Sequence, residues 1–127
     1  MSEANLHIKV AQYIRSTYPD IIFTSESSGV RLTIGQAVLL KKLRSDKAMP
    51  DLWQLEARKG FHGMLLELKK EGTIIYKKDG ELRRDKHLKE QEEILKRLTD
   101  KGYFAKFCVG FDAAKSLIDF YLREANE

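Results

Sequence analysis

Three side chains near the middle of the chain have the types and spacing for hydrolytic chemistry. Asp51 follows a proline, and Glu67 and Lys69 interrupt the otherwise apolar run FHGMLLELKKEG. In a strand alternate side chains share a face, so Glu67 and Lys69 should project together while Leu66 and Leu68 point to the opposite, buried side. A carboxylate and an ammonium are therefore expected side by side where a purely structural strand would be apolar.

A hairpin would bring a second carboxylate to the same face. Residues 51–57 and 61–69 both have the composition of strands, and residues 58–60 would connect them as a three-residue loop that ends in glycine. Counted back along both strands, this pairing places Asp51 opposite Glu67, although a bulge would shift the register. Two adjacent carboxylates repel each other unless a cation lies between them.

A divalent metal ion is the natural cation for this pair. Mg²⁺ commonly takes one or two carboxylates together with water and substrate phosphate oxygens. Lys69 would then orient or help to deprotonate the attacking water and balance charge on a pentavalent phosphorane, which predicts a phosphodiesterase. Each residue alone also has a structural explanation, since Asp51 could cap a turn and Glu67 with Lys69 could be an ion pair worth under ~1 kcal/mol. Taken together, the three residues favour a metal-dependent catalytic site over these structural explanations.

The surrounding sequence predicts the elements that must position these residues. Helices are expected at 3–18, 33–45, 86–101 and 112–127, and strands at 20–27, 51–57, 61–69 and 103–111. Ser2 and Thr33 are expected N-caps, and Gly102 is the expected stop of the third helix. A turn is expected at 27–29, and residues 71–86 should form a solvated, basic excursion. The order predicts a single α/β domain over residues 1–127, with a central mixed sheet flanked by helices.

Composition limits the classes of protein to consider. Hydrophobic residues make up 43% and charged residues 33%, which excludes a disordered chain, and the apolar runs are too short to span a bilayer. Lys and Arg number 23 against 19 Asp and Glu, a net charge of +4 that is compatible with DNA but not diagnostic of it. Cys108 has no disulfide partner, His62 and His87 lack zinc-site spacing, and the start of the chain is unlike a signal peptide. We expect a cytoplasmic protein with no membrane partner.

Pro50-Asp51 followed by Glu67-Leu68-Lys69 resembles the signature of the PD-(D/E)XK nuclease superfamily, which implies a restriction-endonuclease-like αβββαβ core. Nearly the whole chain looks like the VRR-NUC (virus-type replication-repair nuclease) branch, especially its small stand-alone phage and prophage members. The stretches that carry this resemblance are Glu3-x-x-Leu6-His7, MPDLWQLE, GMLLELKKEG, KEQEEILKRLTDKGY and GFDAAKSLIDFYL.

The resemblance implies roles for the central residues. Asp51 and Glu67 would bind the metal, with the backbone carbonyl of Leu68 as a further ligand, and Lys69 would be the catalytic lysine. Gln91 matches the glutamine of the following helix, where its amide would orient the lysine or contact a phosphate. The structural alternative for Gln91 is a polar residue at the rim of an apolar helix face.

A glutamate on the first helix is a less specific feature. Glu3 matches a residue that in this superfamily often reaches the metal, directly or through water. The helix dipole also favours a glutamate in the first turn without any catalytic role. Glu26 is the nearest substitute, and His7 is expected at the surface or the rim of the site.

The segment 31–47 is more basic than a minimal core requires. Its cations could neutralise DNA phosphates beside the site, or they could form an ordinary solvated helix face, and the sequence does not decide between these alternatives. The candidates are Arg31, Lys41, Lys42, Arg44 and Lys47.

The leading hypothesis is a Mg²⁺- or Mn²⁺-dependent endodeoxyribonuclease, which the resemblance assigns to a phage or prophage and to the bacterial host cytoplasm. Parts of this family act on branched DNA such as Holliday junctions, and two symmetric scissile strands would require a homodimer. One alternative is a non-catalytic DNA-binding or assembly module on the same fold. Another is a subunit directed by phage replication, recombination or packaging proteins. The presence of both carboxylates and the lysine favours the enzyme.

Overall fold

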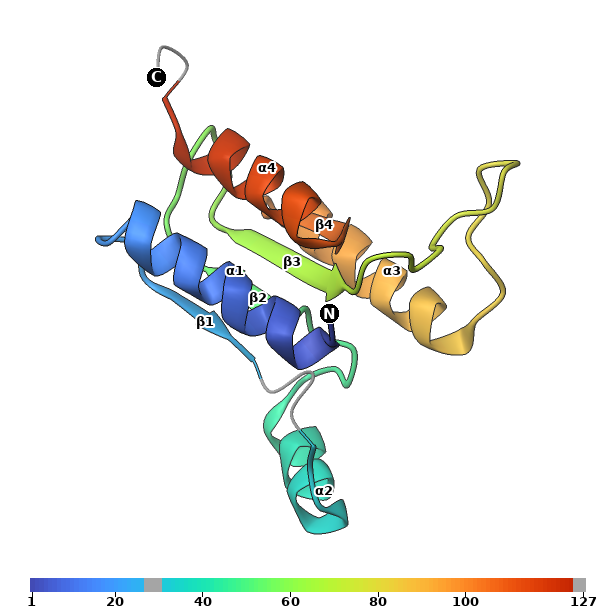
Figure 1. Ribbon diagram of the computed structural model, residues 1–127. Helices are drawn as coiled ribbons and strands as arrows, with labels where there is room; N and C mark the ends of the chain where they lie inside the picture. The colour runs from blue at the N-terminus through green and yellow to red at the C-terminus, as the bar shows by residue number, and fades with distance from the viewer. Residues whose placement is uncertain (27–30, 125–127) are drawn as a thin grey trace.

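The computed structural model describes residues 1–26 and 31–124. These residues form four helices and four strands in the order α1 (Glu3–Thr17), β1 (Phe23–Ser25), α2 (Ile34–Leu43), β2 (Leu52–Gln54), β3 (Met64–Lys69), α3 (Lys86–Asp100), β4 (Phe104–Val109) and α4 (Phe111–Leu122) (Figure 1). The predicted αβββαβ core is therefore confirmed, with α2 inserted between β1 and β2 and α4 added at the end. The turn predicted at 27–29 lies outside the described residues.

The sheet is mixed, as the sequence predicts. Its strands are ordered β1-β2-β3-β4, with antiparallel pairing from β1 to β3 and parallel pairing between β3 and β4. Leu66 packs in one cluster with Leu6 of α1 and Tyr121 of α4, whereas Leu65 packs in another with Leu95 of α3. Because adjacent residues of a strand point to opposite faces, α1 and α4 cover one face of the sheet and α3 covers the other.

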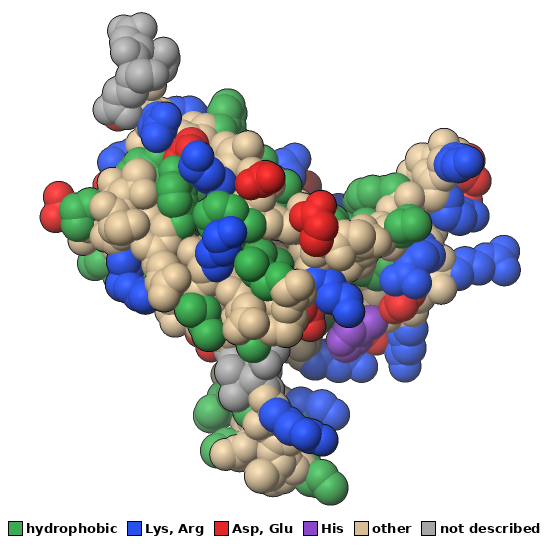
Figure 2. Space-filling view, in the orientation of Figure 1, with side chains coloured by type: hydrophobic (Ala, Val, Ile, Leu, Met, Phe, Trp, Pro, Cys, Tyr) green, Lys and Arg blue, Asp and Glu red, His purple; other side chains and the backbone are tan. Residues whose placement is uncertain are grey.

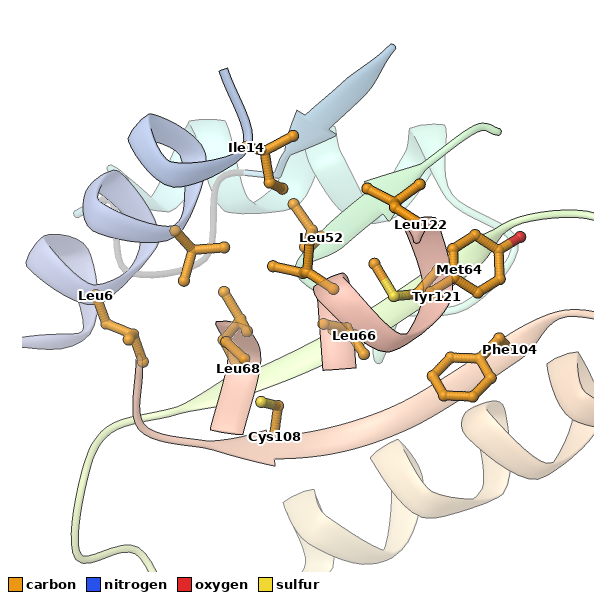
Figure 3. Close-up of a cluster of buried hydrophobic side chains, with 13 residues drawn as sticks. Leu6, Ile14, Leu52, Met64, Leu66, Leu68, Phe104, Cys108, Tyr121 and Leu122 are labelled. Atoms are coloured by element: carbon orange, nitrogen blue, oxygen red, sulfur yellow. The ribbon is translucent and has the colours of Figure 1, made fainter. Parts of the chain in front are cut away.

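The larger core lies between the sheet and the pair α1 and α4 (Figure 3). Its side chains are almost fully removed from water, which is the main favourable contribution to folding. Alternate residues of β3 face this core, and the alternation continues along the strand as far as the proposed site. The labelled members are Leu6, Ile14, Leu52, Met64, Leu66, Leu68, Phe104, Cys108, Tyr121 and Leu122.

The tip of the β2–β3 hairpin differs from the predicted three-residue loop. Arg58 pairs with Phe61, so the loop has two residues, Lys59 and Gly60. Both have positive φ, 54° and 84°, as a type I′ turn requires. The backbone of such a turn matches the right-handed twist of the two strands. Glycine adopts the positive φ of the second turn position without steric strain.

The predicted register of the ladder is nevertheless confirmed. Leu52 pairs with Leu66 and Gln54 with Met64. Between this ladder and the turn, three residues (55–57) lie on one side and two (62–63) on the other, so one extra residue absorbs the shift as a bulge does. The paired strands are accordingly shorter than the predicted segments.

The helix starts follow the predicted caps. The Ser2 hydroxyl accepts a hydrogen bond from the Asn5 amide, and Thr33 forms a reciprocal capping box with Gln36. α4 ends at Leu122, earlier than predicted. None of the helices in the described ranges is long and apolar enough to cross a bilayer.

Candidate active site

The two predicted carboxylates meet where β2 and β3 part. Leu66 is the last residue of β3 that pairs with β2, so Glu67 extends past the start of β2. The Asp51 amide donates to the Leu66 carbonyl at 3.1 Å, and Asp51 Oδ2 accepts from the Leu68 amide at 2.9 Å. These two hydrogen bonds to the backbone of β3 hold the Asp51 carboxylate beside Glu67, and neither depends on a side chain of β3.

Both carboxyl groups are buried, with Asp51 3% and Glu67 4% exposed. Burial, followed by the charge of Asp51 and a hydrogen bond with it, raises the pKa of Glu67 to about 9, and the positive charge of Lys69 offsets part of this. Glu67 therefore keeps its proton at neutral pH in the metal-free protein. The predicted repulsion between the two carboxylates is thus the second cause of this raised pKa, after burial.

Lys69 and Gln91 complete the predicted cluster. Lys69 Nζ lies 3.8 Å from Glu67 Oε1, which confirms that the two side chains share a face. The Gln91 side-chain amide donates to the same Glu67 oxygen. α3 places Gln91 there because Gln91 lies on the buried stripe with Leu88 and Leu95. Sequence reasoning placed this glutamine near the site but did not foresee its bond to Glu67.

His7 contradicts its predicted place at the surface or rim. It is 6% exposed, its Nδ1 lies 3.4 Å from Ser25 Oγ, and its Nε2 lies 3.8 Å from Asp51 Oδ2. The signal was present in the sequence, since His7 continues the buried stripe of Val10 and Ile14 toward the start of α1. A polar residue on such a stripe must find a partner in the interior.

The remaining proposed ligands lie around this cluster. Glu3 is exposed in the first turn of α1, one turn before His7. The backbone amide of Glu26 donates to the Asp51 carbonyl at 2.6 Å. Roles for Glu3, Glu26 and the Leu68 carbonyl in metal binding stay predictions.

Unsatisfied polar atoms gather at this cluster. Among the described residues, four buried side-chain atoms lack a hydrogen-bond partner, and three of them are His7 Nε2, Glu67 Oε2 and Gln91 Oε1. Buried polar atoms are usually paired, so such a concentration indicates a site that receives a ligand or ordered water. In the described ranges no three His, Cys, Asp or Glu side chains form a ready-made metal cage. Two carboxylates beside open coordination space still fit Mg²⁺ or Mn²⁺, which retain waters and substrate oxygens.

A groove of about 870 Å³ lies between α2 and the start of α3. Three of the predicted DNA-binding residues line it, and Arg31 and Lys42 are exposed nearby in sequence without lining it. Figure 2 shows Lys and Arg side chains over α2, the start of α3 and the segment between β3 and α3, which contains most of the predicted excursion. The charged residues of the groove are Lys41, Arg44, Lys47, Lys86, Asp85 and Glu90.

The groove and the carboxylate cluster share one helix, α3. Glu90 lines the groove and forms an ion pair with Lys47 at 3.3 Å, while the next residue, Gln91, bonds Glu67. None of the residues that line the groove belongs to the carboxylate cluster, so a role of the basic segment in DNA binding beside the site stays a prediction.

No protein-family model and no curated protein matches the chain. A solved structure named VRR_NUC domain protein is similar to it, with a TM-score of 0.68 and 21% identity. The similarity covers 96% of this chain and 88% of the other. Likeness at this identity establishes the architecture, and the chain has the α/β fold of that VRR_NUC domain protein.

Proposed function

We propose that this chain is a Mg²⁺- or Mn²⁺-dependent endodeoxyribonuclease. One observation carries the proposal: two buried carboxylates, Asp51 and Glu67, lie at the open end of the sheet with Lys69 beside them and with unsatisfied polar atoms around them. A carboxylate pair kept out of water is costly for stability, so a functional role accounts for it better than a structural one. The fold shared with a VRR_NUC domain protein supports the same class.

The residues divide the work of phosphodiester hydrolysis. Asp51 and Glu67 would hold the ion, which when bound supplies Lewis acidity at the scissile phosphate. The Leu68 amide fixes Asp51, and Gln91 fixes Glu67. Lys69, whose side chain is 14% exposed, can reach an attacking water and balance the negative charge that develops on phosphorus.

The groove between α2 and α3 is the proposed path of the DNA backbone. Its four cations outnumber its two carboxylates, and phosphate contacts of this kind position DNA without reading its sequence.

A branched DNA substrate and a homodimer form the finer part of the proposal. α2 projects from the sheet (Figure 1) and buries none of its residues. Four of its apolar side chains are exposed, Ile34 by 87% and Leu43 by 70%, with Val38 and Leu39 also exposed. Such a surface favours association, and a two-fold dimer would present two sites to symmetric strands. Phage or prophage origin, and work beside replication or recombination proteins, rest on the resemblance of sequence motifs alone.

The decisive experiment incubates purified protein with supercoiled, linear, single-stranded and four-way-junction DNA, with Mn²⁺, with Mg²⁺ and with a chelator. Metal-dependent cleavage that Asp51→Asn abolishes would support the proposal. The exposed apolar helix also favours the alternative of a non-catalytic assembly module, which binds DNA but cleaves none of these substrates. Binding without cleavage under every metal condition would decide for that alternative.

A further inference from the structure

A second hollow, of about 380 Å³, lies between the sheet and the last turns of α3. We call it the aromatic pocket, because Trp53 and Tyr103 line it. Its volume falls within the range that small ligands occupy in proteins. Neither the carboxylate cluster nor the groove between α2 and α3 uses any residue of this pocket. Its other apolar side chains include Met49, Leu65, Ile94 and Leu98.

The register of β2 and β3 places the aromatic pocket beside the carboxylates. Trp53 pairs with Leu65 across the two strands, and both side chains pack on the α3 face of the sheet. Asp51 and Glu67 each lie two residues further along, and side chains two residues apart share a face. This step corresponds to roughly 6.6 Å along a strand. The pocket therefore occupies the row next to the carboxylates on one face.

α3 contacts the three features at successive turns. Residues 85–87 and 90 line the groove, Gln91 donates to Glu67, and Ile94 and Leu98 line the aromatic pocket. The groove, the carboxylates and the pocket thus follow one another along a single helix.

The aromatic side chains of the pocket are held in place by their neighbours. Trp53 Nε1 donates to the Pro50 carbonyl at 2.7 Å, which fixes the orientation of the indole ring. Tyr103 meets the ring of His62 edge-on, with 5.5 Å between the ring centroids. Two oriented rings among aliphatic side chains suit a flat ligand that stacks.

The charges of the pocket suit a ligand attached to an anionic chain. Arg97 and Lys101 both line it. Arg97 forms an ion pair with Asp46 at 3.2 Å, whereas Lys101 is exposed at the end of α3 and can meet a phosphate. A flat ring joined to a chain of phosphates is a nucleotide of DNA.

We propose, on the basis of the nuclease function above, that the aromatic pocket takes an unpaired nucleobase of the DNA substrate near the scissile phosphate. Every base has a π-face, so an aromatic and aliphatic lining selects an unpaired nucleotide and not a sequence. A base in a continuous duplex must first leave the stack, at a cost that an unpaired base does not carry. The unpaired nucleotide is thus the feature of a branched DNA that this protein recognises.

The fluorescence of Trp53 tests the pocket directly, because it is the only tryptophan of the chain. Wild-type protein is titrated in the presence of a chelator with a duplex that carries one unpaired nucleotide, and with the same DNA made abasic at that position. The base should quench Trp53 and should strengthen binding roughly 5–150-fold over the abasic DNA, which has the same phosphates. Equal affinity for the two DNAs, or unquenched fluorescence, would overturn the proposal.

The titration does not depend on cleavage, because no metal ion is present. The cleavage assay with Mn²⁺ and Mg²⁺ therefore decides the nuclease function separately. A change of Trp53 fluorescence with protein concentration in the absence of DNA would show that a second copy of the chain covers the pocket, and it would overturn the proposal.

A variant of the pocket provides the second readout. Tyr103→Leu keeps an apolar side chain and removes the ring, so it should reduce the preference for the base over the abasic site. Phe120→Leu is the matched control, because Phe120 is 57% exposed on α4 at the opposite face of the sheet, and it should keep the preference. An equal loss in both variants would overturn the proposal. Should Tyr103→Leu fold poorly, the wild-type comparison of the two DNAs still decides.

Discussion

At the scale of single residues, the site consists of polar groups that have lost water without gaining enough partners. The raised pKa of Glu67 keeps its carboxyl group protonated, so no second negative charge is buried beside Asp51. The Nε2 atom of His7 has no hydrogen-bond partner. Both arrangements are unfavourable in the metal-free protein, and the proposed cation would relieve the repulsion between the carboxylates.

Neutralising either carboxylate separates metal chemistry from folding. Asp51→Asn and Glu67→Gln keep side-chain size but remove the charge that a hard cation needs, so metal-dependent cleavage should fall by at least ~10²–10³-fold. In Asp51→Asn the carbonyl oxygen of the new side chain can still accept the hydrogen bond from the Leu68 amide, so circular dichroism should remain native. Asp79→Asn, which removes a carboxylate from an exposed turn, is the control and should cleave DNA like the wild type. If Asp51→Asn and Glu67→Gln cleaved as well as this control, the proposed metal site would be refuted.

Lys69 is expected to act in the chemical step. Lys69→Met keeps the apolar stem and removes the ammonium, so single-turnover cleavage should slow by ~10²-fold or more while the Mn²⁺-induced rise in melting temperature persists. Loss of metal affinity with an unchanged rate of cleavage would reverse the assignment of roles.

At the scale of elements, α2 differs from the other helices because it has no buried face, so its N-terminal cap matters more for its stability. It buries no residue, and the capping box of Thr33 and Gln36 satisfies amides that no packing contact protects. The basic residues of α2 consequently lie away from the sheet and can meet a ligand without disturbing the core.

The contribution of α2 to DNA binding can be measured by charge removal. Changing Lys41, Lys42 and Arg44 to Ala in a cleavage-inactive background should weaken DNA binding and reduce the slope of log K against log salt by up to about 2.7, because each lost phosphate contact contributes about 0.9. The matched control removes three cations from α1 and α4, namely Lys9, Arg15 and Lys115. If both triple variants shift the slope equally, the basic groove is not the binding surface.

The elements themselves were largely predictable because their signals are local. Caps, helical periodicity and the alternation in β3 depend on neighbours in sequence, and they gave α1, α3 and the face shared by Glu67 and Lys69. The turn at Lys59 and Gly60 was missed because a compensating bulge cannot be read from composition. The helical stripe of α1 indicated that His7 is buried, but its partners Ser25 and Asp51 are distant in sequence and could not be predicted.

At the scale of the whole molecule, the raised pKa of Glu67 links stability to pH. The folded metal-free protein holds a proton on Glu67 that the unfolded chain releases above its ordinary pKa of 4.5, so the free energy of unfolding should fall as pH rises from about 4.5 to about 9. Urea titrations at several pH values should show this decline in the wild type and a flatter profile in Glu67→Gln. If the free energy of unfolding of the wild type depended on pH no more steeply than that of Glu67→Gln, Glu67 would not be protonated in the folded protein.

Divalent ions should offset that loss. An ion that binds only the folded state adds about 2.7 kcal/mol to the free energy of unfolding at one hundred times its Kd, so Mn²⁺ should raise the melting temperature by several degrees at neutral pH. The double variant Asp51→Asn, Glu67→Gln should show no rise and should itself melt higher than the metal-free wild type. A Mn²⁺ response that survives in the double variant would place the ion elsewhere.

The position of α2 also has a consequence for how such a protein can change. α2 leaves the sheet after β1 and the chain returns at β2, and these two strands are neighbours. A segment inserted between adjacent strands can be lengthened, shortened or exchanged while the ladder on which Asp51 and Glu67 depend stays in place. If the proposed function holds, exchanging this one segment would change which DNA or partner the protein meets and would leave Asp51 and Glu67 in place.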